Sequence, residues 1–291
     1  MNHFMYIACM FIWGLNFIAV KIQGTETSLE ASLLYRSVIA FILFYVLLKI
    51  SRIKINRKET SFLAVIGFGV CNFAVSYLLL YYGTIYSTAA LVTLIFSLKA
   101  ITTPIFIGIV FKTKIEGKIY IGGFLGLLSV VVILYPDLHE ISSNVILGIG
   151  LAFLGTLITS IGDTLSTFNN KKGTEPIAAN TIGMLSAVIL IGAIALISGK
   201  DMHMPMTLNY WGGLLYLAIF ASFVAWLFYL LLVKNVGAAE SSYMVAMFPA
   251  IGGFASVLMG ETAFTVNLVI GILLAMAGAY IALAKKRKSI A

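Results

Sequence analysis

One basic residue lies near the middle of a long apolar run. Lys99 belongs to residues 86–111, a stretch long enough to cross a lipid bilayer as a helix. An ammonium group at that depth costs roughly 2.5–3.5 kcal/mol to insert, so charged residues there are usually retained for function. We expect Lys99 to face a polar interior and to balance an anionic ligand group such as a carboxylate or a phosphate. The alternatives are an ion pair with an acid on another helix, or a lysine that is neutral when buried.

Two acidic residues could form that ion pair. Asp163 lies in the apolar run 144–168, and Glu240 lies at the start of the run 236–259. Both are about five residues, or about 7 Å along a helix, from the ends of their runs, whereas Lys99 is about 12 residues from either end of its own. Direct pairing therefore needs a bent path or a bridging water. The same two carboxyl groups are candidates for carrying a coupling proton, although the helix dipole alone would favour Glu240 in a first turn.

A second cation lies closer to a membrane surface. Arg36 is about seven residues into the run 29–49, with Asn16 at a similar depth in the first run and Lys21 at its end. Together these residues could form an electropositive vestibule that attracts anions. The alternatives for Arg36 are a side chain that extends to the lipid headgroups, or a tie to Glu26 or Glu30 in the preceding loop.

Three aromatic residues also fall near the predicted midplane. Trp13, Tyr77 and Phe248 could line a binding cavity, or could simply pack between helices. Glu261 follows the run 236–259, and we interpret it as a turn residue before Thr265 caps the last helix.

The sequence contains no pattern typical of an enzyme. His3, His139 and His203 lie in loops or near a terminus, and there is no P-loop, H-E-x-x-H or G-x-S-x-G motif. Cys9 and Cys71 lie within apolar runs and are interpreted as packing residues rather than metal ligands. We therefore expect no catalytic activity, no cofactor and no metal.

Composition indicates a helical membrane protein. The chain has 291 residues, of which 61% are hydrophobic and only 10% are charged, against about 25% in soluble domains. We predict an all-α membrane protein with ten transmembrane helices. The ten predicted spans are residues 3–22, 29–49, 60–82, 86–111, 117–136, 144–168, 177–198, 207–232, 236–259 and 264–284. Two very tight turns are expected, at residues 82–86 and 233–236.

The distribution of basic residues predicts the orientation. If the N-terminus is cytoplasmic, fifteen of the 19 Lys and Arg residues fall in cytoplasmic segments and only Lys21 and Lys200 fall in segments on the outer side of the membrane. The remaining two, Arg36 and Lys99, lie within the predicted spans. The sequence therefore predicts a multi-pass protein of the inner or plasma membrane with both termini in the cytoplasm. The basic tail KKRK, residues 285–288, then lies near anionic headgroups, which excludes nucleic acid as the preferred partner of the net charge of +8. The first apolar run lacks a basic n-region and a cleavage pattern, and is expected to be a retained helix.

The ten spans divide into two sets of five. When the first half is shifted so that Tyr77 meets Trp226, residues 75–134 superpose on residues 224–283 without a gap. We call this shift the repeat offset. An odd number of spans in each half gives the halves opposite orientations, as in many secondary transporters, whose substrate sites lie near the midplane. The predicted units are residues 1–138 and residues 139–291, each a five-helix repeat of one integral membrane unit.

Several motifs resemble those of the EamA family of the drug/metabolite transporter superfamily. Residues 11–21, FIWGLNFIAVK, are similar to the first-helix pattern W-G-x-N-F-x-x-x-K of that family. Arg36 followed by an apolar run, AAESS at residues 238–242 followed by Phe248-Pro249 and Gly260-Glu261, and the glycine pair Gly271 and Gly278 extend the resemblance over the whole chain. The resemblance implies a ten-helix transporter of small metabolites, with export the commoner direction. It does not account for Lys99, which marks a departure from the family pattern.

The sequence therefore predicts a secondary transporter of a small polar metabolite that carries a carboxylate, such as an amino acid, and favours export over import. Its partners are a small-molecule substrate, the lipid bilayer and a proton or another coupling ion. One alternative is a carrier of a cationic or quaternary-amine solute held by Trp13, Tyr77 and Phe248 through cation–π contacts. Another is a membrane protein that handles lipid or binds partners without transport, for which a dry midplane is expected.

Overall fold

A computed structural model describes residues 2–53, 55–56, 58, 60–135, 142–236, 241 and 243–283. Every regular element within these ranges is a helix. Eight helical segments are long and apolar enough to cross a membrane, and two shorter apolar helices follow at Met244–Leu258 and Val266–Ala282. The prediction of an all-helical membrane protein is confirmed at this level.

The helices follow the predicted apolar runs closely. In the first half they are α1 (Asn2–Gly14), α2 (Asn16–Gln23), α3 (Leu29–Ile50), α4 (Phe62–Gly69), the π-helix η1 (Val70–Val75), α5 (Ser76–Tyr86), α6 (Ala89–Ser97), α7 (Lys99–Phe111) and α8 (Gly117–Leu134). In the second half they are α9 (Ser143–Lys171), α10 (Pro176–Ile197), α11 (Leu208–Leu215), the π-helix η3 (Tyr216–Val224), α12 (Ala225–Val236), the short 3₁₀ helix η4 (Tyr243–Met247), α14 (Phe248–Leu258) and α15 (Val266–Leu283).

The two predicted tight turns are wrong. Residues 82–86 belong to α5, and residues 233–236 belong to α12. The first chain reversal instead falls at Ser87 and Thr88, because the Thr88 side chain accepts a hydrogen bond from the backbone N–H of Leu91 and caps α6. A hydroxyl at the N-cap satisfies a helix donor that has no other partner in an apolar surrounding.

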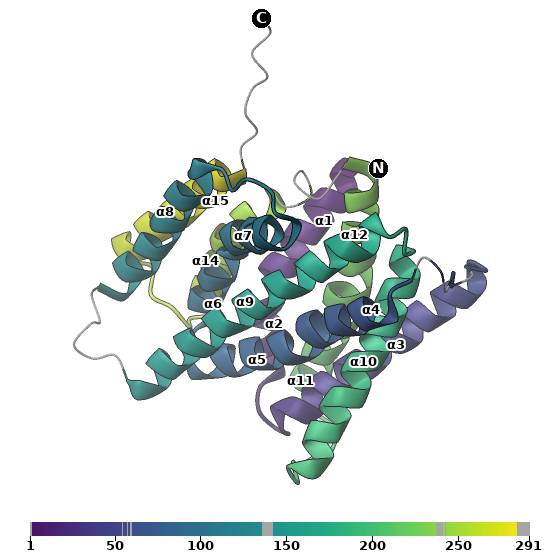
Figure 1. Cartoon of the computed structure of the whole chain (residues 1–291). Coiled ribbons are helices and arrows are strands. Elements are labelled where there is room, and N and C mark those ends of the chain that lie inside the picture. The colour runs from purple at the N-terminus through teal and green to yellow at the C-terminus, as the bar shows by residue number, and fades with distance from the viewer. Residues whose placement is uncertain are drawn as a thin grey trace, which may run out of the picture.

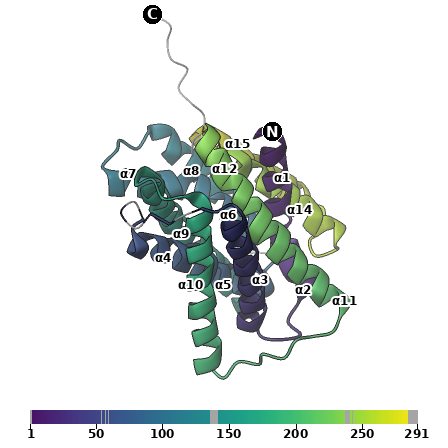
Figure 2. The ribbon, with the colours of Figure 1, turned by 90° about the vertical axis from the view of Figure 1, so that its right-hand side faces the viewer.

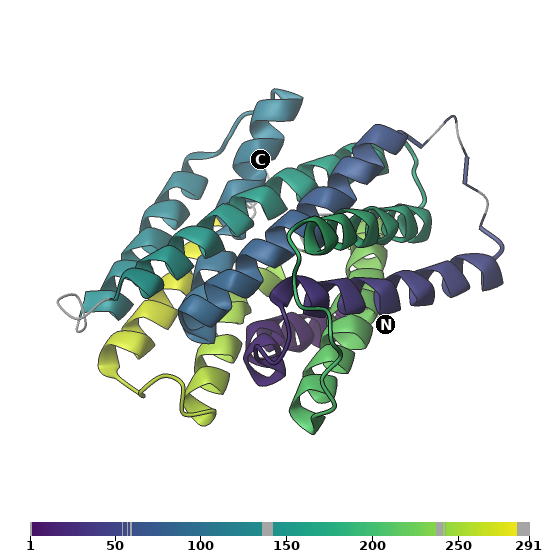
Figure 3. The same ribbon diagram turned by 90° about the horizontal axis from the view of Figure 1, so that it is seen from below.

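The helices pack as one bundle. Figure 1 shows α8 and α15 side by side on one flank, and α3 and α10 together on the other. Figure 2 shows α3 between α10 and the long segment that contains α11 and α12. Seen from below in Figure 3, α9 runs diagonally across the bundle beside α5. The long helix α9 therefore lies against the interior-facing helices of the first half.

Helices α8 and α15 approach very closely because glycines face each other. A Cβ atom built on Gly122 would lie 2.5 Å from the carbonyl oxygen of Gly278, and one built on Gly278 would lie 2.7 Å from the carbonyl oxygen of Gly122. No side chain fits in that space, so the two backbones pack directly. Small residues allow such close packing between apolar helices, which maximises van der Waals contact where the hydrophobic effect is weak.

Helix boundaries recur at the repeat offset. Helix α8 spans Gly117–Leu134 and α15 spans Val266–Leu283, so the same shift relates both their starts and their ends. The break between α6 and α7 falls at Leu98, and the start of α14 follows Met247. The π-helical segment η1 also corresponds to the second part of η3. Helix breaks and π-helical turns are uncommon and frequently mark functional sites.

Candidate functional site

The guanidinium of Arg36 is the most deeply buried cation described here. The side chain projects from α3 and is only 1% exposed. Its Nε donates to the hydroxyl of Ser222 at 2.7 Å, and its carbon Cζ lies 4.2 Å from the centre of the Tyr77 ring. The two terminal nitrogens make long contacts of 3.4 Å, one to the hydroxyl of Tyr81 and one to Oδ1 of Asn16. Every one of these partners is neutral.

Within the described ranges, no carboxylate lies within 4 Å of Arg36. The two acids considered from the sequence bind elsewhere, since Glu30 pairs with Lys200 at 3.3 Å and Glu26 accepts from the hydroxyl of Thr207 at 2.6 Å. The side chain is also too buried to reach lipid headgroups. Both structural alternatives for Arg36 are therefore wrong, because its side chain is buried inside the bundle and both acids have other partners.

A cavity surrounds this guanidinium, and we call it the central cavity. Its volume is about 40 Å³. Five of the residues selected from the sequence line it, namely Trp13, Asn16, Arg36, Tyr77 and Lys99. Sequence reasoning missed four further lining residues that carry polar atoms, Asn72, Tyr81, Thr159 and Trp226. The cavity is narrow, so it fits a small polar group in this conformation.

Phe248 does not line the central cavity. It is 1% exposed, stacks on Phe96 with ring centres 6.4 Å apart, and meets Trp13 edge to face at 6.5 Å. As the first residue of α14 it lies behind these two rings, which form the wall instead. The expectation that Phe248 is a lining residue is wrong because depth along a helix does not determine the direction of a side chain.

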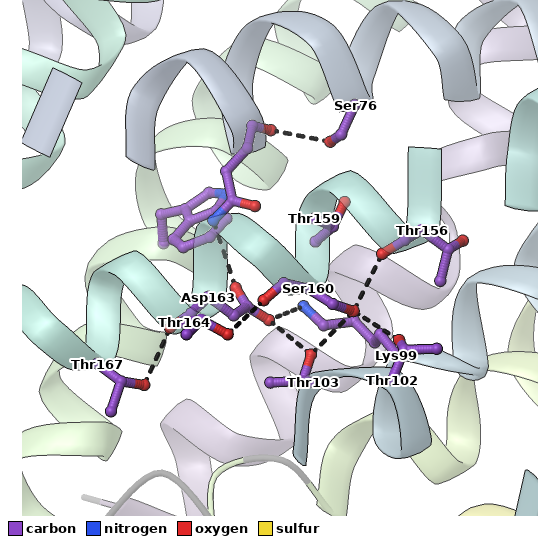
Figure 4. A network of polar contacts seen from close by, with 12 residues as sticks. Ser76, Lys99, Thr102, Thr103, Thr156, Thr159, Ser160, Asp163, Thr164 and Thr167 are labelled. Atoms are coloured by element: carbon purple, nitrogen blue, oxygen red, sulfur yellow. Dashed lines mark hydrogen bonds and ion pairs between the residues drawn. The ribbon is translucent and has the colours of Figure 1, made fainter. Parts of the chain in front are cut away.

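Lys99 forms a direct ion pair with Asp163. The Nζ atom lies 2.9 Å from Oδ2 of Asp163, and the two side chains are 12% and 7% exposed. Asn72 donates to the other carboxylate oxygen at 3.3 Å, and the hydroxyl of Thr103 donates to Oδ2 at 3.4 Å. Figure 4 shows the lysine and the aspartate pointing toward one another from α7 and α9. The charge of Lys99 is thus balanced by the protein itself.

The pairing needs no bridging water because of two local features. The span that carries Lys99 breaks at Leu98, so α7 begins with Lys99 itself at the break. Helix α9 also continues past its predicted end as far as Lys171, which places Asp163 deeper than expected. Glu240, the other candidate acid and coupling residue, lies outside the described residues.

A stripe of polar residues on α9, which was not predicted from the sequence, supports this site. Its members are Thr156, Thr159, Ser160, Asp163, Thr164 and Thr167, which follow the spacing i, i+3, i+4, i+7, i+8 and i+11 of one helix face. Ser160 exchanges a hydrogen bond with Thr102 at 2.5 Å, which joins the stripe to α7 (Figure 4). Counting polar residues at this period within a membrane helix would have found the stripe.

At the end of the bundle that carries Ala89, a charged cluster joins both halves. Lys21 pairs with Glu261 at 3.0 Å and donates to the carbonyl oxygen of Ser87 at 2.8 Å. The same carboxylate accepts the backbone N–H of Ala89 at 3.0 Å and the hydroxyl of Ser256 at 2.7 Å. Lys21 is therefore tied to Glu261 rather than grouped with Arg36 in an open vestibule.

Glu261 thus binds three elements rather than only shaping a turn. The separate expectation that Thr265 caps the last helix is confirmed, since its hydroxyl accepts the backbone N–H of Leu268 at 3.1 Å. In the first turn of α3, the Glu30 carboxylate raises the pKa of Lys200 above its ordinary value.

The helices and the buried polar site define a class of protein, a multi-pass helical membrane protein with a charged cavity between its helices. The model of the EamA-like transporter family matches residues 2–135 and 146–284, and the chain belongs to that family. This membership confirms the resemblance seen in the motifs and makes the protein a membrane transporter by family.

Relatives with curated names agree with the family. An uncharacterized transporter of Archaeoglobus fulgidus is 25% identical over 277 residues, which cover 94% of this chain and 95% of that protein. An uncharacterized transporter of Clostridium kluyveri is 25% identical over 83% of this chain and 78% of its own length. The uncharacterized transporter YyaM of Bacillus subtilis is 22% identical over 79% of this chain and 74% of its own. A crystal structure of 14% identity shares the fold, with a TM-score of 0.71 over 97% of this chain and 96% of that one.

Proposed function

We propose that this protein is a secondary transporter of a small metabolite that carries a carboxylate, and that Arg36 binds this group. The observation that carries the proposal is the guanidinium itself, 1% exposed, with neutral partners only among the described residues around it. An uncompensated buried charge costs several kcal/mol, and a cation–π contact with Tyr77 offsets about 2 kcal/mol of that. A substrate anion would supply the missing charge.

The geometry of Arg36 suits a carboxylate. Only Nε makes a short hydrogen bond, to Ser222, while both terminal nitrogens make contacts of 3.4 Å that a stronger acceptor could replace. A guanidinium binds a carboxylate through two parallel hydrogen bonds, which a lysine cannot do. Asn16 and the rings of Trp13 and Tyr77 would then contact the remainder of the substrate.

We assign Lys99 and Asp163 a second role in the transport cycle. Lys99 lines the central cavity and is bound to Asp163, so a substrate anion that contacts Lys99 must compete with this carboxylate. An aspartate that loses its lysine partner in a low-dielectric site gains affinity for a proton. Asp163 is therefore the proposed proton-coupling residue, with Glu240 as a second candidate from the sequence.

The proposed mechanism is alternating access between two inverted five-helix repeats, residues 1–138 and residues 139–291. The helix boundaries that recur at the repeat offset support this arrangement. So does the hydrogen bond of 2.9 Å from Trp226 to Tyr77, since these residues occupy equivalent positions and can touch only near a shared axis. Inverted repeats place the substrate site between the halves, near the midplane. The basic residues of the sequence support a cytoplasmic location for both termini in the cell membrane, and we favour export as the direction.

The test begins with a thermal-shift screen of the purified protein against anionic, zwitterionic and cationic metabolites. The hits are then measured in proteoliposomes with wild type, R36K and R36Q. Loss of the carboxylate contact is expected to reduce transport at least a hundredfold in R36Q, and R36K is expected to stay strongly impaired because it lacks the paired donors. Stabilisation by choline-like cations alone would favour the cation carrier, and wild-type transport by R36Q would refute the proposal.

A further inference from the structure

A second and larger cavity opens at the opposite end of the bundle from Glu261. Its volume is about 530 Å³. It lies between α7, the connection that follows it, and the last turns of α9. This volume admits a whole metabolite, whereas the central cavity admits only a small group in this conformation.

The charged lining of this cavity is basic. Among the residues that the structure describes, four lysines line it, Lys99, Lys114, Lys118 and Lys171, together with two acids, Glu116 and Asp163. Each acid already lies close to a lysine, with Asp163 2.9 Å from Lys99 and Glu116 3.0 Å from Lys118. The surplus positive charge therefore comes from Lys114 and Lys171.

Neither surplus lysine is neutralised within the part of the chain that the structure describes. No carboxylate there lies within 4 Å of Lys114 or Lys171, and Lys171 is placed 3.8 Å from the centre of the Phe111 ring. Hydrogen-bonding side chains complete the wall, namely Thr103, Ser166, Thr167 and Asn170. Charged walls of low dielectric constant focus the electric field and raise the local concentration of the opposite charge.

We propose that this cavity, which we call the basic chamber, is a second anion-binding site. It receives a small carboxylate or phosphate compound from the aqueous phase at this end and holds it before it reaches Arg36. Lys99 belongs to both cavities, whereas Asp163 lines only the basic chamber and Arg36 lines only the central one. The Lys99–Asp163 pair is then the partition that the anion must open. This loading role rests on the proposed transport of an anion, but the binding of anions does not.

Adjacent lysines offer a matched control. Lys171 lines the basic chamber and Lys172 does not, and the same holds for Lys114 and Lys112. The pair K114Q/K171Q removes two charges from the chamber, while K112Q/K172Q removes two charges from the ends of α7 and α9 outside it. A general effect of the basic membrane face would alter both variants equally.

The test measures the chamber potential without reference to transport. Both native cysteines are replaced by alanine, and S166C places a reporter thiol in the wall. Its reaction rates with a sulfonate-bearing and a trimethylammonium-bearing methanethiosulfonate are compared in neutral detergent at low salt, relative to a free thiol. A positive chamber is expected to favour the sulfonate reagent, and K114Q/K171Q is expected to lower the rate ratio about tenfold, with little change in K112Q/K172Q.

The outcomes separate the two proposals. An equal change in both double variants, or a ratio unaffected by K114Q/K171Q, would overturn the anion site. T113C, at the exposed rim of the chamber, repeats the measurement should S166C fail to fold.

If the chamber is positive but R36Q transports normally, the chamber stands and the proposed role of Arg36 falls. In proteoliposomes, the loading role predicts a KM raised severalfold in K114Q/K171Q for substrate presented at this end only, with kcat unchanged, and an unchanged KM would remove that role.

Discussion

Arg36 and Lys99 line the same cavity, but their charges are balanced in different ways. The lysine has a carboxylate at 2.9 Å within a network of hydroxyl groups, whereas the arginine has a serine, an asparagine and aromatic rings. This contrast shows that the partners of a buried charge, rather than its depth in the membrane, indicate whether it needs a ligand. Lys99 has the more unusual position in the sequence, yet Arg36 has the stronger need for an external anion.

The largest expected effect comes from breaking the Lys99–Asp163 ion pair. D163N leaves the ammonium of Lys99 without its carboxylate, and removing one member of a buried pair typically costs about 3–5 kcal/mol of folding free energy. Unfolding of the purified protein by heat or denaturant measures this loss. The double variant K99Q/D163N is expected to recover most of it, because no charge is left uncompensated.

Arg36 provides the matched comparison for that experiment. R36Q removes a charge that has no carboxylate partner in the described chain, so it leaves no opposite charge exposed to an apolar surrounding. The lost bond to Ser222 and the removed burial cost act in opposite directions, and we expect a net change below about 1.5 kcal/mol. A large destabilisation in R36Q together with a small one in D163N would reverse the comparison and assign Arg36 to structure.

The sequence predicts the scaffold well because bilayer thickness requires long apolar runs. Described helices such as α3 and α10 fall within one residue of the predicted spans, and the fourth predicted span contains both α6 and α7. The matching boundaries of α8 and α15 also follow from the repeat offset, which is visible in the sequence. These features depend on local composition and on length, which a single sequence contains.

The partners of the charges could not be predicted in the same way. Whether Lys99 reaches Asp163 depends on the break at Leu98 and on how α7 packs against α9, and neither leaves a periodic signal in an apolar segment. Phe248 lies behind Phe96 and Trp13 rather than in the wall of the cavity, which its position in the sequence does not reveal. The polar stripe of α9, in contrast, was present in the spacing of its Thr and Ser residues and could have been found.

A second ion pair extends the comparison to the end of the bundle near Ala89. Lys21–Glu261 and Lys118–Glu116 have the same separation of 3.0 Å, but Glu261 is 17% exposed and Glu116 is 48% exposed. E261Q also weakens the acceptor for the backbone N–H of Ala89. We expect E261Q to cost about 1.5–3 kcal/mol, as for hydrogen bonds to charged groups, and E116Q to cost less than about 1 kcal/mol.

Unfolding measurements on both variants test this difference. If E261Q and E116Q lose equally little unfolding free energy, the Lys21–Glu261 contact does not hold the two halves together at this end. Leu80 lines the central cavity, so the substitution L80C provides a thiol that a reagent can label from the Ala89 end. A loss of stability confined to E261Q, together with faster labelling of this thiol, would support a contact that must open during transport. The cysteine is placed in a background without Cys9 and Cys71.

The smallest expected effect concerns the contact between equivalent residues. Y77F removes the acceptor of the hydrogen bond from Trp226 but keeps the ring that lies 4.2 Å from Arg36. The loss should be about 1 kcal/mol of unfolding free energy, with little effect on substrate affinity, because the cation–π contact persists. Y77L removes both interactions, and its substrate affinity is expected to fall as well. If Y77F alone abolishes binding, the Tyr77 hydroxyl contacts the substrate directly, and the site centred on Arg36 must be redrawn to include it.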